Sequence, residues 1–355
     1  MHLMRQEFEL YVTVDNNVPT SSDKTNSDIC AKNLFMTVYI TTFITGLPLN
    51  ILAFCTLIAK FRQKLVPVDI LLLNLTISDL LLLIFLPFKI VEASSGMYWQ
   101  MPYIFCPLSS FLYFSSIYIT TLFLTAISVE RYLGVAFPIK YKLLRKPLYS
   151  IIASIFIWIT AVSHCSMVYI VQIYQPANET KTNLTTNETK PNARRCYSTF
   201  SPKQLSILLP VRFEACLILF CIPLIITLFC YIKFVRIILS QPLISRQKKK
   251  RAVGLVVTTL LNFVICFMPY NISHIVGFVQ GKSPAWRVYA LMLSTFNASI
   301  DPIIFYFSSS SFRKTFLKKI MIGKKLHLSG CWDEVCLPLC GNDTESTVTT
   351  GLSSQ

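Results

Sequence analysis

Three cationic side chains stand in long apolar stretches of the sequence, where a charge is costly and therefore marks a candidate functional site. These residues are Arg212, His274 and Arg287. Arg287 follows Ser283-Pro284, a typical helix start, and the free N–H groups and dipole of a first turn already favour an anion. Each arginine can form paired hydrogen bonds with a carboxylate, and the histidine can donate another. The three residues predict a carboxylate-binding site.

A structural explanation competes with this one. Both arginines can extend to lipid headgroups, or they can pair with Glu92 or Glu214. Glu214 lies two residues after Arg212, so the two side chains leave a helix in different directions. Pairing with Glu92 and contact with lipid stay open on the sequence alone.

The elements that would hold these residues are seven apolar stretches of about 20 or more residues each. They cover residues 35–59, 68–90, 104–129, 148–173, 205–238, 252–279 and 286–307. At roughly 1.5 Å per residue, a helix of this length crosses a hydrocarbon core of about 30 Å. The stretches lack the alternation of barrel strands, and a composition of 53% hydrophobic and 14% charged residues excludes several soluble domains. The sequence predicts an all-α membrane protein, a seven-transmembrane helix bundle.

Clusters of lysine and arginine follow the first, third and fifth stretches, and the positive-inside rule makes these three loops cytoplasmic. The formal charge of +16 therefore reflects how the chain is oriented in the membrane, and no nucleic acid is expected as a partner. Residues 1–33 lack a charged start followed by an apolar core, so the first helix would be the signal anchor and the N-terminus extracellular. The loop after the fourth helix supports this orientation with three N-glycosylation sequons, at Asn178, Asn183 and Asn187.

Most of the twelve cysteines lie inside apolar stretches, where a thiol is a small hydrophobic group. Cys106 and Cys196 instead fall at extracellular positions, in a compartment that permits oxidation. We expect a disulfide between them. The pairing state of Cys30, a third extracellular cysteine, stays open.

Almost every predicted helix carries one marker, and the order and spacing of the markers are more specific than any one of them. They are Asn50 after Gly46-Leu47-Pro48, Asp79 after Asn74-Leu75-Thr76-Ile77-Ser78, Glu130-Arg131-Tyr132, Trp158, Pro223, Pro269 and Asp301-Pro302. In these features the chain resembles the rhodopsin-like (class A) G-protein-coupled receptors. It is more closely similar to the free fatty acid receptors, particularly the short-chain subtypes, through residues 70–74, 86–93, 209–212, 259–267, 269–274 and 305–310.

The resemblance implies a multi-pass receptor of the plasma membrane, and not an enzyme. It implies activation by short-chain fatty acids such as acetate, propionate and butyrate. Heterotrimeric G proteins are the implied partners, with the inhibitory class expected and the Gq class as the alternative. The coupling residues would be Glu130, Arg131 and Tyr132, with Glu130 holding Arg131 at rest.

In the free fatty acid receptors two arginines and a histidine hold the ligand carboxylate, a role that the resemblance gives to Arg212, Arg287 and His274. Tyr270, one turn before His274 on the same helix face, matches a further binding residue. His164 matches another, although a lone histidine on an apolar helix is often an ordinary core residue.

Aromatic residues repeat at roughly helical spacing in the third helix, at Phe111, Phe114 and Tyr118. They can form the floor of a small pocket or pack as ordinary core residues. In the resemblance, phenylalanine at Phe114 favours the propionate- and butyrate-preferring subtype. The family usually carries an acidic residue soon after the loop cysteine, where this chain has Ser198-Thr199, so a loop carboxylate restraining the arginines is not expected.

Two carboxylates, Asp79 and Asp301, lie inside apolar stretches, with Thr120 and Asn297 expected nearby. Like charges in a low dielectric cannot both stay ionised without a partner. We expect either an allosteric sodium ion at Asp79 or a hydrogen-bonded cluster in which the two aspartates share a proton. No other cofactor or metal is expected.

The domain organisation follows from these features: an extracellular tail at 1–33, the seven-transmembrane domain at 34–310, and cytoplasmic segments after it. Residues 311–322 show the pattern of a short amphipathic helix on the membrane lipids of the cytoplasmic leaflet. Residues 323–355 should be disordered, with palmitoylation candidates at Cys331, Cys336 and Cys340. Serines and threonines near the end would be phosphorylated by receptor kinases and then bind arrestin.

Two other functions fit a set of basic residues in a membrane bundle. One is a class A receptor for another small anion, a hydroxycarboxylate or a nucleotide. The other is an organic-anion transporter, although the sequence has no matching halves of the kind that transporters usually show. The foot of the sixth helix is entirely basic at residues 248–251, so the resting state should be held loosely and basal signalling should be measurable.

Overall fold

The structure is a computed structural model of the chain. It describes residues 21–63, 66–144, 146–173, 196–197, 200–308 and 312–314, with side chains from residue 29 onward except at 142 and 144. The three sequons, the three palmitoylation candidates and most of the predicted amphipathic helix lie outside this part. Only residues 312–314 of that helix are described, and they are helical.

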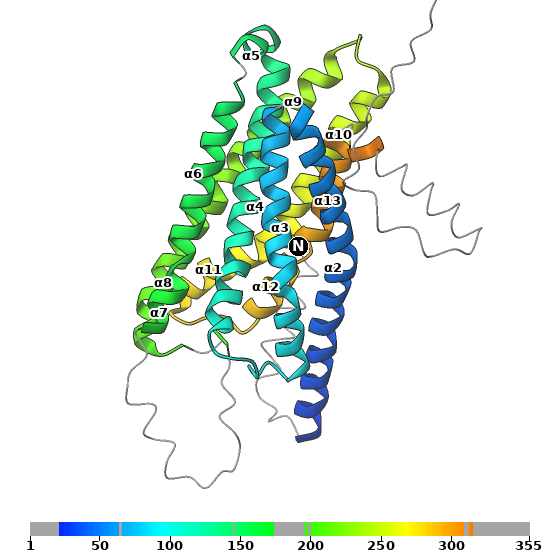
Figure 1. The fold of residues 1–355 in the computed structure, drawn as a ribbon. Helices are drawn as coiled ribbons and strands as arrows, with labels where there is room; N and C mark the ends of the chain where they lie inside the picture. The colour runs from blue at the N-terminus through cyan, green and yellow to red at the C-terminus, as the bar shows by residue number, and fades with distance from the viewer. Residues whose placement is uncertain are drawn as a thin grey trace, which may run out of the picture. The chain divides into compact units, whose positions relative to one another are not determined.

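Seven helical spans in the described residues are long and apolar enough to cross a membrane, and no strand occurs among them (Figure 1). The first four are formed by α2 (Ser21–Gln63), α3 (Pro67–Ser94), α4 (Phe105–Ala136), and α6 (Pro147–Cys165) continued by α7 (Met167–Ile173). The fifth combines α8 (Pro202–Ala215), the π-helical turn η3 (Cys216–Cys221) and α9 (Ile222–Ser240). The sixth combines α10 (Arg246–Leu261), the π-helical turn η4 (Asn262–Phe267) and α11 (Met268–Gln280), and the seventh α12 (Arg287–Ser294) and α13 (Asn297–Ser308). The predicted seven-helix bundle is confirmed.

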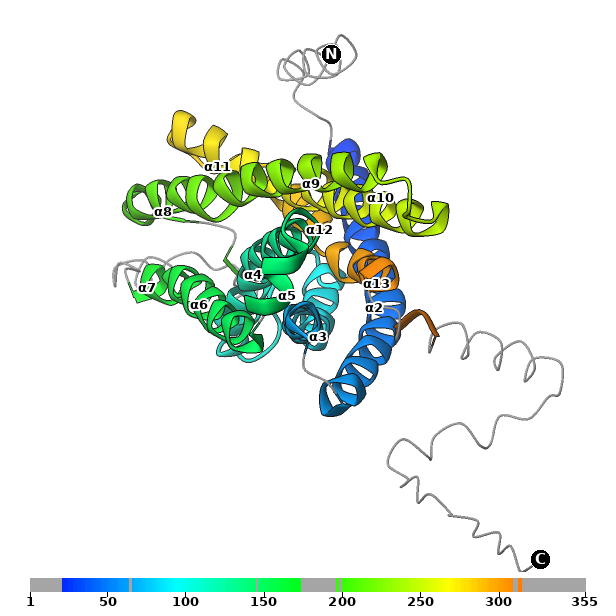
Figure 2. The same cartoon turned by 90° about the horizontal axis from the view of Figure 1, so that it is seen from above.

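The short helix α5 (Pro138–Leu144) joins the third and fourth spans and marks one end of the bundle, called here the inner end. The opposite end, called the outer end, carries the loop residues Cys196 and Tyr197. The third span is the central one, because 78% of its most apolar window is buried, against 28% for the first and fourth spans. Helix α4 contacts α3, α6, α9 and both π-helical turns. The view down the bundle shows α4 near its middle (Figure 2).

Both π-helical turns end directly before a helix with proline as its second residue. Pro223 is the second residue of α9, and Pro269 is the second residue of α11. A proline inside a helix removes one backbone hydrogen bond and crowds the carbonyl four residues earlier, so the hydrogen-bond ladder shifts locally. The fifth and sixth spans therefore each consist of an outer and an inner half, joined at an irregular turn.

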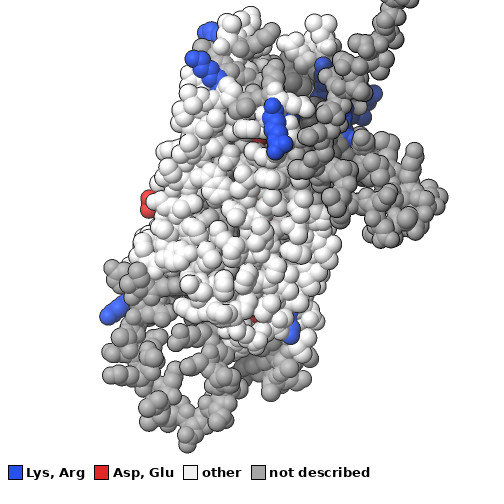
Figure 3. Space-filling model, viewed as in Figure 1, with Lys and Arg blue, Asp and Glu red and all other residues white. Residues whose placement is uncertain are grey.

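The surface agrees with a membrane-spanning bundle. Figure 3 shows a broad middle belt in which the described atoms include no Lys or Arg on this face, with blue side chains near both ends. Several helices begin before their apolar stretch: α2 extends back to Ser21 into the predicted tail, and α10 begins at Arg246. Polar and basic residues can continue a helix beyond the hydrocarbon, so the apolar stretch underestimates its length.

Candidate carboxylate site

A small cavity of about 40 Å³ lies within the outer half of the bundle. All six predicted ligand residues line it: Phe114, His164, Arg212, Tyr270, His274 and Arg287. They come from five different helical spans, and the fold brings all six together around this one cavity. Their role in binding is a separate matter and stays a prediction.

Local structure explains how the fifth span presents Arg212. Helix α8 begins with a capping box, in which Ser201 and Gln204 satisfy each other's backbone N–H groups. The Gln204 side chain also donates from Nε2 to the Val171 carbonyl at 3.0 Å, which ties the start of α8 to α7. Arg212 follows in the last turn of α8, immediately before the π-helical turn η3.

The Arg212 guanidinium is a buried cation without a counterion among the described residues. The residue is only 7% exposed, and neither terminal nitrogen has a hydrogen-bond partner within the part of the chain that the structure describes. Its guanidinium carbon lies 5.0 Å from the centroid of the Phe200 ring. Burial excludes the lipid headgroup explanation for this residue, and Glu92 pairs instead with Lys89 at 2.8 Å.

Arg287 is equally buried and is the first residue of α12. Its Nη2 donates to the Tyr270 hydroxyl at 3.2 Å, while its Nε has no hydrogen-bond partner in the described residues. The guanidinium carbon lies 5.3 Å from the Tyr270 ring and 5.6 Å from the Phe114 ring. These contacts hold the charge in place but leave donor capacity free.

Two histidines complete the polar lining. His274 is 1% exposed, and its Nε2 lies 3.3 Å from the Tyr118 hydroxyl. The Nδ1 of His274 and the Nε2 of His164 have no hydrogen-bond partner among the residues that the structure describes. The His164 ring lies 6.4 Å from the Tyr118 ring. Tyr118 therefore stands between the two histidines. It was outside the predicted ligand set, although its spacing of four residues from Phe114 indicated the same helix face.

The electrostatics of the cavity favour an anion. Buried polar groups are normally satisfied, and a buried unpaired charge is strongly unfavourable. Here two guanidinium groups and two imidazoles have donor or acceptor atoms that no described residue pairs with, and all four groups surround one small space. Burial raises the pKa of the Tyr197 phenol, whereas Arg212 and Arg287 act to lower it, so the field of both arginines reaches this loop residue. A carboxylate is the complement that these donors match.

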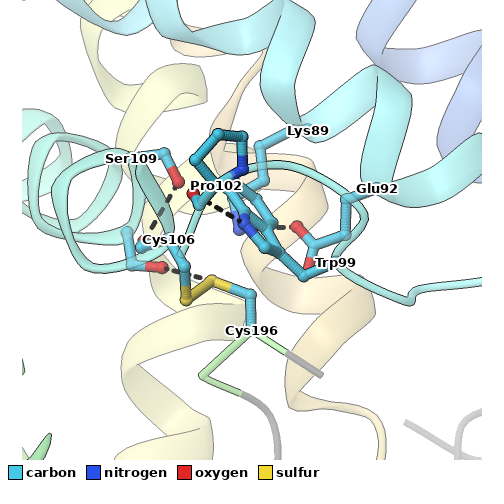
Figure 4. Close-up of a disulfide and its surroundings, with 8 residues drawn as sticks. Lys89, Glu92, Trp99, Pro102, Cys106, Ser109 and Cys196 are labelled. Carbon is cyan, nitrogen blue, oxygen red and sulfur yellow. Dashed lines mark hydrogen bonds and ion pairs between the residues drawn. A yellow bond between two sulfur atoms is a disulfide. The ribbon is translucent and has the colours of Figure 1, made fainter. Parts of the chain in front are cut away.

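The predicted disulfide joins Cys106, in the first turn of α4, to Cys196, with a Cα–Cα distance of 5.7 Å. Figure 4 shows it beside the Lys89–Glu92 ion pair and Trp99. The Trp99 Nε1 donates to the Pro102 carbonyl at 3.3 Å. Because Cys196 immediately precedes Tyr197, the disulfide fixes a cavity-lining residue to the central helix. Cys30 is exposed and has no disulfide partner among the described residues.

Comparison with known proteins assigns the fold to a family. The sequence model of the 7 transmembrane receptor (rhodopsin family) matches residues 49–305, more than half of the chain. This chain belongs to the rhodopsin family of receptors. The receptor is 48% identical to free fatty acid receptor 3 of Mus musculus over 301 residues, which cover 85% of this chain and 90% of the relative. It is 50% identical to free fatty acid receptor 2 of Homo sapiens over 291 residues, which cover 82% and 86%.

The similarity is nearly equal for two of the named subtypes, so identity alone does not separate them. Free fatty acid receptor 1 of Mesocricetus auratus is more distant, at 33% identity over 275 residues, which cover 76% of this chain and 90% of the relative. The receptor is thus similar to fatty-acid-sensing receptors, and like the rest of its family it is a receptor and not an enzyme.

A second polar cluster lies deeper in the receptor. Asp79 and Asp301 are both fully buried and lie close enough to interact through their carboxyl groups. Asn262 donates to Asp301 Oδ1 at 2.7 Å, and one turn earlier on α13 Asn297 donates to Thr120 Oγ1 at 3.2 Å. All four predicted residues thus lie in this region. Asn262 was missed, although an asparagine inside an apolar stretch was a visible signal.

The three predicted coupling residues lie at the inner end of the bundle, and Arg131 contacts the last residue of α13 there. Arg131 donates from Nη2 to the Ser308 carbonyl at 3.0 Å and also to the Ser308 hydroxyl. Glu130 accepts a hydrogen bond from the Tyr141 hydroxyl of α5. Tyr132 packs edge-on against Phe137 and Phe229. Arg131 is therefore held at least in part by the seventh span.

A cavity of about 420 Å³ opens at this end, lined by Glu130 and by four cations: Arg131, Lys248, Arg251 and Arg313. The neighbouring Lys249 points elsewhere, because its Nζ donates to the Leu239 carbonyl at the end of α9, at 2.8 Å. Of the lysines in the basic segment, Lys248 is thus the one that shares a cavity with Arg131.

Helix α10 approaches α13 very closely beside this cavity. A Cβ added to Gly254 would lie 2.6 Å from the Phe307 ring, closer than real Cβ contacts allow. The glycine therefore sets how closely the sixth and seventh spans can pack at the inner end.

Proposed function

We propose that this protein is a cell-surface receptor for short-chain carboxylates, with acetate, propionate and butyrate as its agonists, and that it signals through heterotrimeric G proteins. The observation that carries the proposal is the set of unpaired donors of Arg212, Arg287 and His274 around one cavity. The names of its relatives, which are free fatty acid receptors, support the same ligand class.

The size of the cavity supports a short ligand. A volume of about 40 Å³ holds only a few water-sized groups, so a carboxylate with a few carbons fits and a nucleotide does not. Aromatic rings of Phe114, Tyr118 and Tyr270 supply an apolar lining for the hydrocarbon. Carboxylate recognition and chain length would thus be set by different residues.

Activation would follow from a carboxylate that binds residues of three spans at once. Arg212 lies on α8, His274 on α11 and Arg287 on α12, and the ligand would draw these outer segments together. The π-helical turns η3 and η4 separate the outer halves from the inner halves, where Arg131 contacts Ser308. A ligand shifts the receptor only by its differential affinity for the two states. The inhibitory class of G protein is the proposed partner, and the Gq class the alternative.

The buried cluster would bind a sodium ion or share a proton. Both Asp79 oxygens lack a hydrogen-bond donor among the described residues, and a hard cation takes oxygen ligands. The oxygens of Asp79 and Asp301 would hold the ion, whose single positive charge would offset one of the two carboxylate charges. We further propose a plasma-membrane location with the N-terminus outside, and regulation by receptor kinases and arrestin through the C-terminal segment.

The proposal is tested by a concentration–response series from acetate to hexanoate in transfected cells, with methyl propionate and propionamide as uncharged analogues. Propionate should signal, and both analogues should be inactive at the same concentrations. Arg287→Gln should abolish the propionate response, whereas Lys203→Gln, at an exposed cation of α8, should leave it unchanged. Equal potency of propionate and its amide would overturn carboxylate recognition by the two arginines.

A further inference from the structure

A second cavity of about 150 Å³ lies beside the carboxylate site. The carboxylate cavity of about 40 Å³ is called here the inner cavity, and it is distinct from the 420 Å³ cavity at the inner end of the bundle. The second space is called the outer cavity, and it is lined by residues of α2, α3, α4 and α12 and of the segment before α12. Three residues line both: Phe114, Tyr197 and Arg287. These three side chains therefore form the partition between the cavities.

The partition is made of rings around a cation. The centroids of the Phe114 and Tyr197 rings are 5.5 Å apart, and the Arg287 guanidinium lies 5.6 Å from the Phe114 ring. The Tyr197 ring also packs edge-on against the Phe200 ring, with 4.9 Å between the ring centroids. Because Arg287 borders both cavities, the hydrocarbon tail of a carboxylate bound to it has a route to either side once a ring is removed.

Tyr197 is held in an unusual conformation. Its φ is 55°, in the left-handed region that a bulky residue rarely adopts. Such strain persists only where the surroundings impose it, and it is concentrated at ligand clamps. The disulfide of Cys196 fixes the backbone on one side, and the contacts with Phe114 and Phe200 fix the ring. In this conformation the Tyr197 side chain borders both cavities.

The outer cavity could hold a hydrocarbon tail but not replace the carboxylate site. Its other charged groups, Lys89 and Glu92, pair with each other at 2.8 Å, so they offer no free cation to an acid. Val288 and Leu291 of α12 contribute apolar lining on the side of Arg287. A carboxylate would therefore stay on Arg287 while its tail extended outward.

We propose that the Tyr197 ring is the residue that limits the chain length of the ligand, by closing the inner cavity off from the outer one. The inference rests on the proposed carboxylate function and adds a specificity determinant to it. Acids longer than the inner cavity accommodates are excluded by the partition. Without the ring, the two cavities form one continuous space along Arg287.

The test compares Tyr197→Ala with the wild-type receptor for acids from acetate to octanoate. Alanine keeps a Cβ and hence the same left-handed backbone penalty, so the substitution removes only the ring. The potency of hexanoate relative to propionate should rise, by about fourfold for each methylene that becomes buried in the outer cavity. Tyr169→Ala is the matched control, since Tyr169 packs on Phe111 at 5.5 Å but lines neither cavity.

The outcomes separate the inference from the function on which it rests. If propionate does not activate the wild-type receptor, the proposed function fails. If propionate activates both receptors and the hexanoate-to-propionate ratio stays unchanged in Tyr197→Ala, the partition role is wrong. Should Tyr197→Ala fail to reach the surface, Phe114→Val opens the same partition from α4 and must shift the ratio in the same direction. An unchanged ratio there also overturns the inference.

Discussion

Replacing Arg212 with methionine should stabilise the ligand-free receptor while removing its response to carboxylates. The guanidinium is 7% exposed, and its terminal nitrogens have no partner among the described residues. Methionine is long, flexible and apolar, so it can fill the same space without a charge. The substitution thus removes the cost of an unpaired buried cation and retains much of the packing.

The size of the effect follows from opposing contributions. Burying an ion costs several kcal/mol even after the protein relaxes. The cation–π contact with the Phe200 ring, at 5.0 Å, offsets about 1 to 2 kcal/mol of this cost. Repulsion from the Arg287 guanidinium adds to the cost. The net gain in the free energy of unfolding for Arg212→Met should be about 2 kcal/mol, which raises Tm by roughly 2 to 4 °C for a chain of this length.

Thermal unfolding of the purified receptor in detergent, with and without excess propionate, measures both consequences. The wild-type receptor should gain about 2.7 kcal/mol at a ligand concentration near 100 times Kd, and Arg212→Met should gain nothing. Lys203→Met, at an exposed cation of the same helix, is the control and should change stability by no more than about 0.5 kcal/mol. A Tm of ligand-free Arg212→Met at or below the wild-type value would refute the reasoning.

Three further predictions concern the disulfide and the inner end. Cys196→Ala should lower the free energy of unfolding by about 2 to 4 kcal/mol, measured by the same thermal assay; an unchanged Tm would contradict it. Gly254→Ala should push α10 away from Phe307, widen the inner-end cavity and raise ligand-free signalling at equal surface expression. Lys248→Glu should lower ligand-free signalling, because the new carboxylate shares a cavity with Arg131. Unchanged ligand-free signalling in Gly254→Ala would refute the packing argument, and unchanged signalling in Lys248→Glu would refute the charge argument.

The seven spans could be predicted from the sequence because their signal is local. An apolar stretch of about 20 residues carries its own evidence, and it does not depend on which neighbour it packs against. The ends of the helices could not be predicted in the same way. Helices α2 and α10 continue into polar and basic residues, where hydropathy no longer distinguishes a helix from a loop.

The cations of the site were also visible locally, since Arg212, His274 and Arg287 each interrupt an apolar stretch. Their surroundings were not. The bond from Arg287 to Tyr270 joins residues 17 apart, and the contact between Tyr118 and His274 joins residues 156 apart. Such pairs depend on the packing of whole spans. The same holds for Asn262 in the π-helical turn η4, which bonds to Asp301 only because η4 and α13 pack against each other.

The position of an added acid within the basic segment at 248–251 matters, because a helix presents successive residues in different directions. Lys249 caps the last turn of α9 through the Leu239 carbonyl, so replacing it would disturb that helix end. Lys248 shares the cavity with Arg131, and its substitution changes the charge there without removing that contact.

Charge and chain length contribute separately to ligand recognition at this site. Every short carboxylate brings the same charged group to Arg212, Arg287 and His274, so this contribution is common to the whole series. Differences among the acids must then come from the hydrocarbon, at about 0.8 kcal/mol for each buried methylene, until the inner cavity is filled. Beyond that length an added methylene meets the ring of Tyr197 instead of apolar space. Potency should therefore rise and then fall sharply along the series, with the position of the maximum set by the partition and not by the arginines.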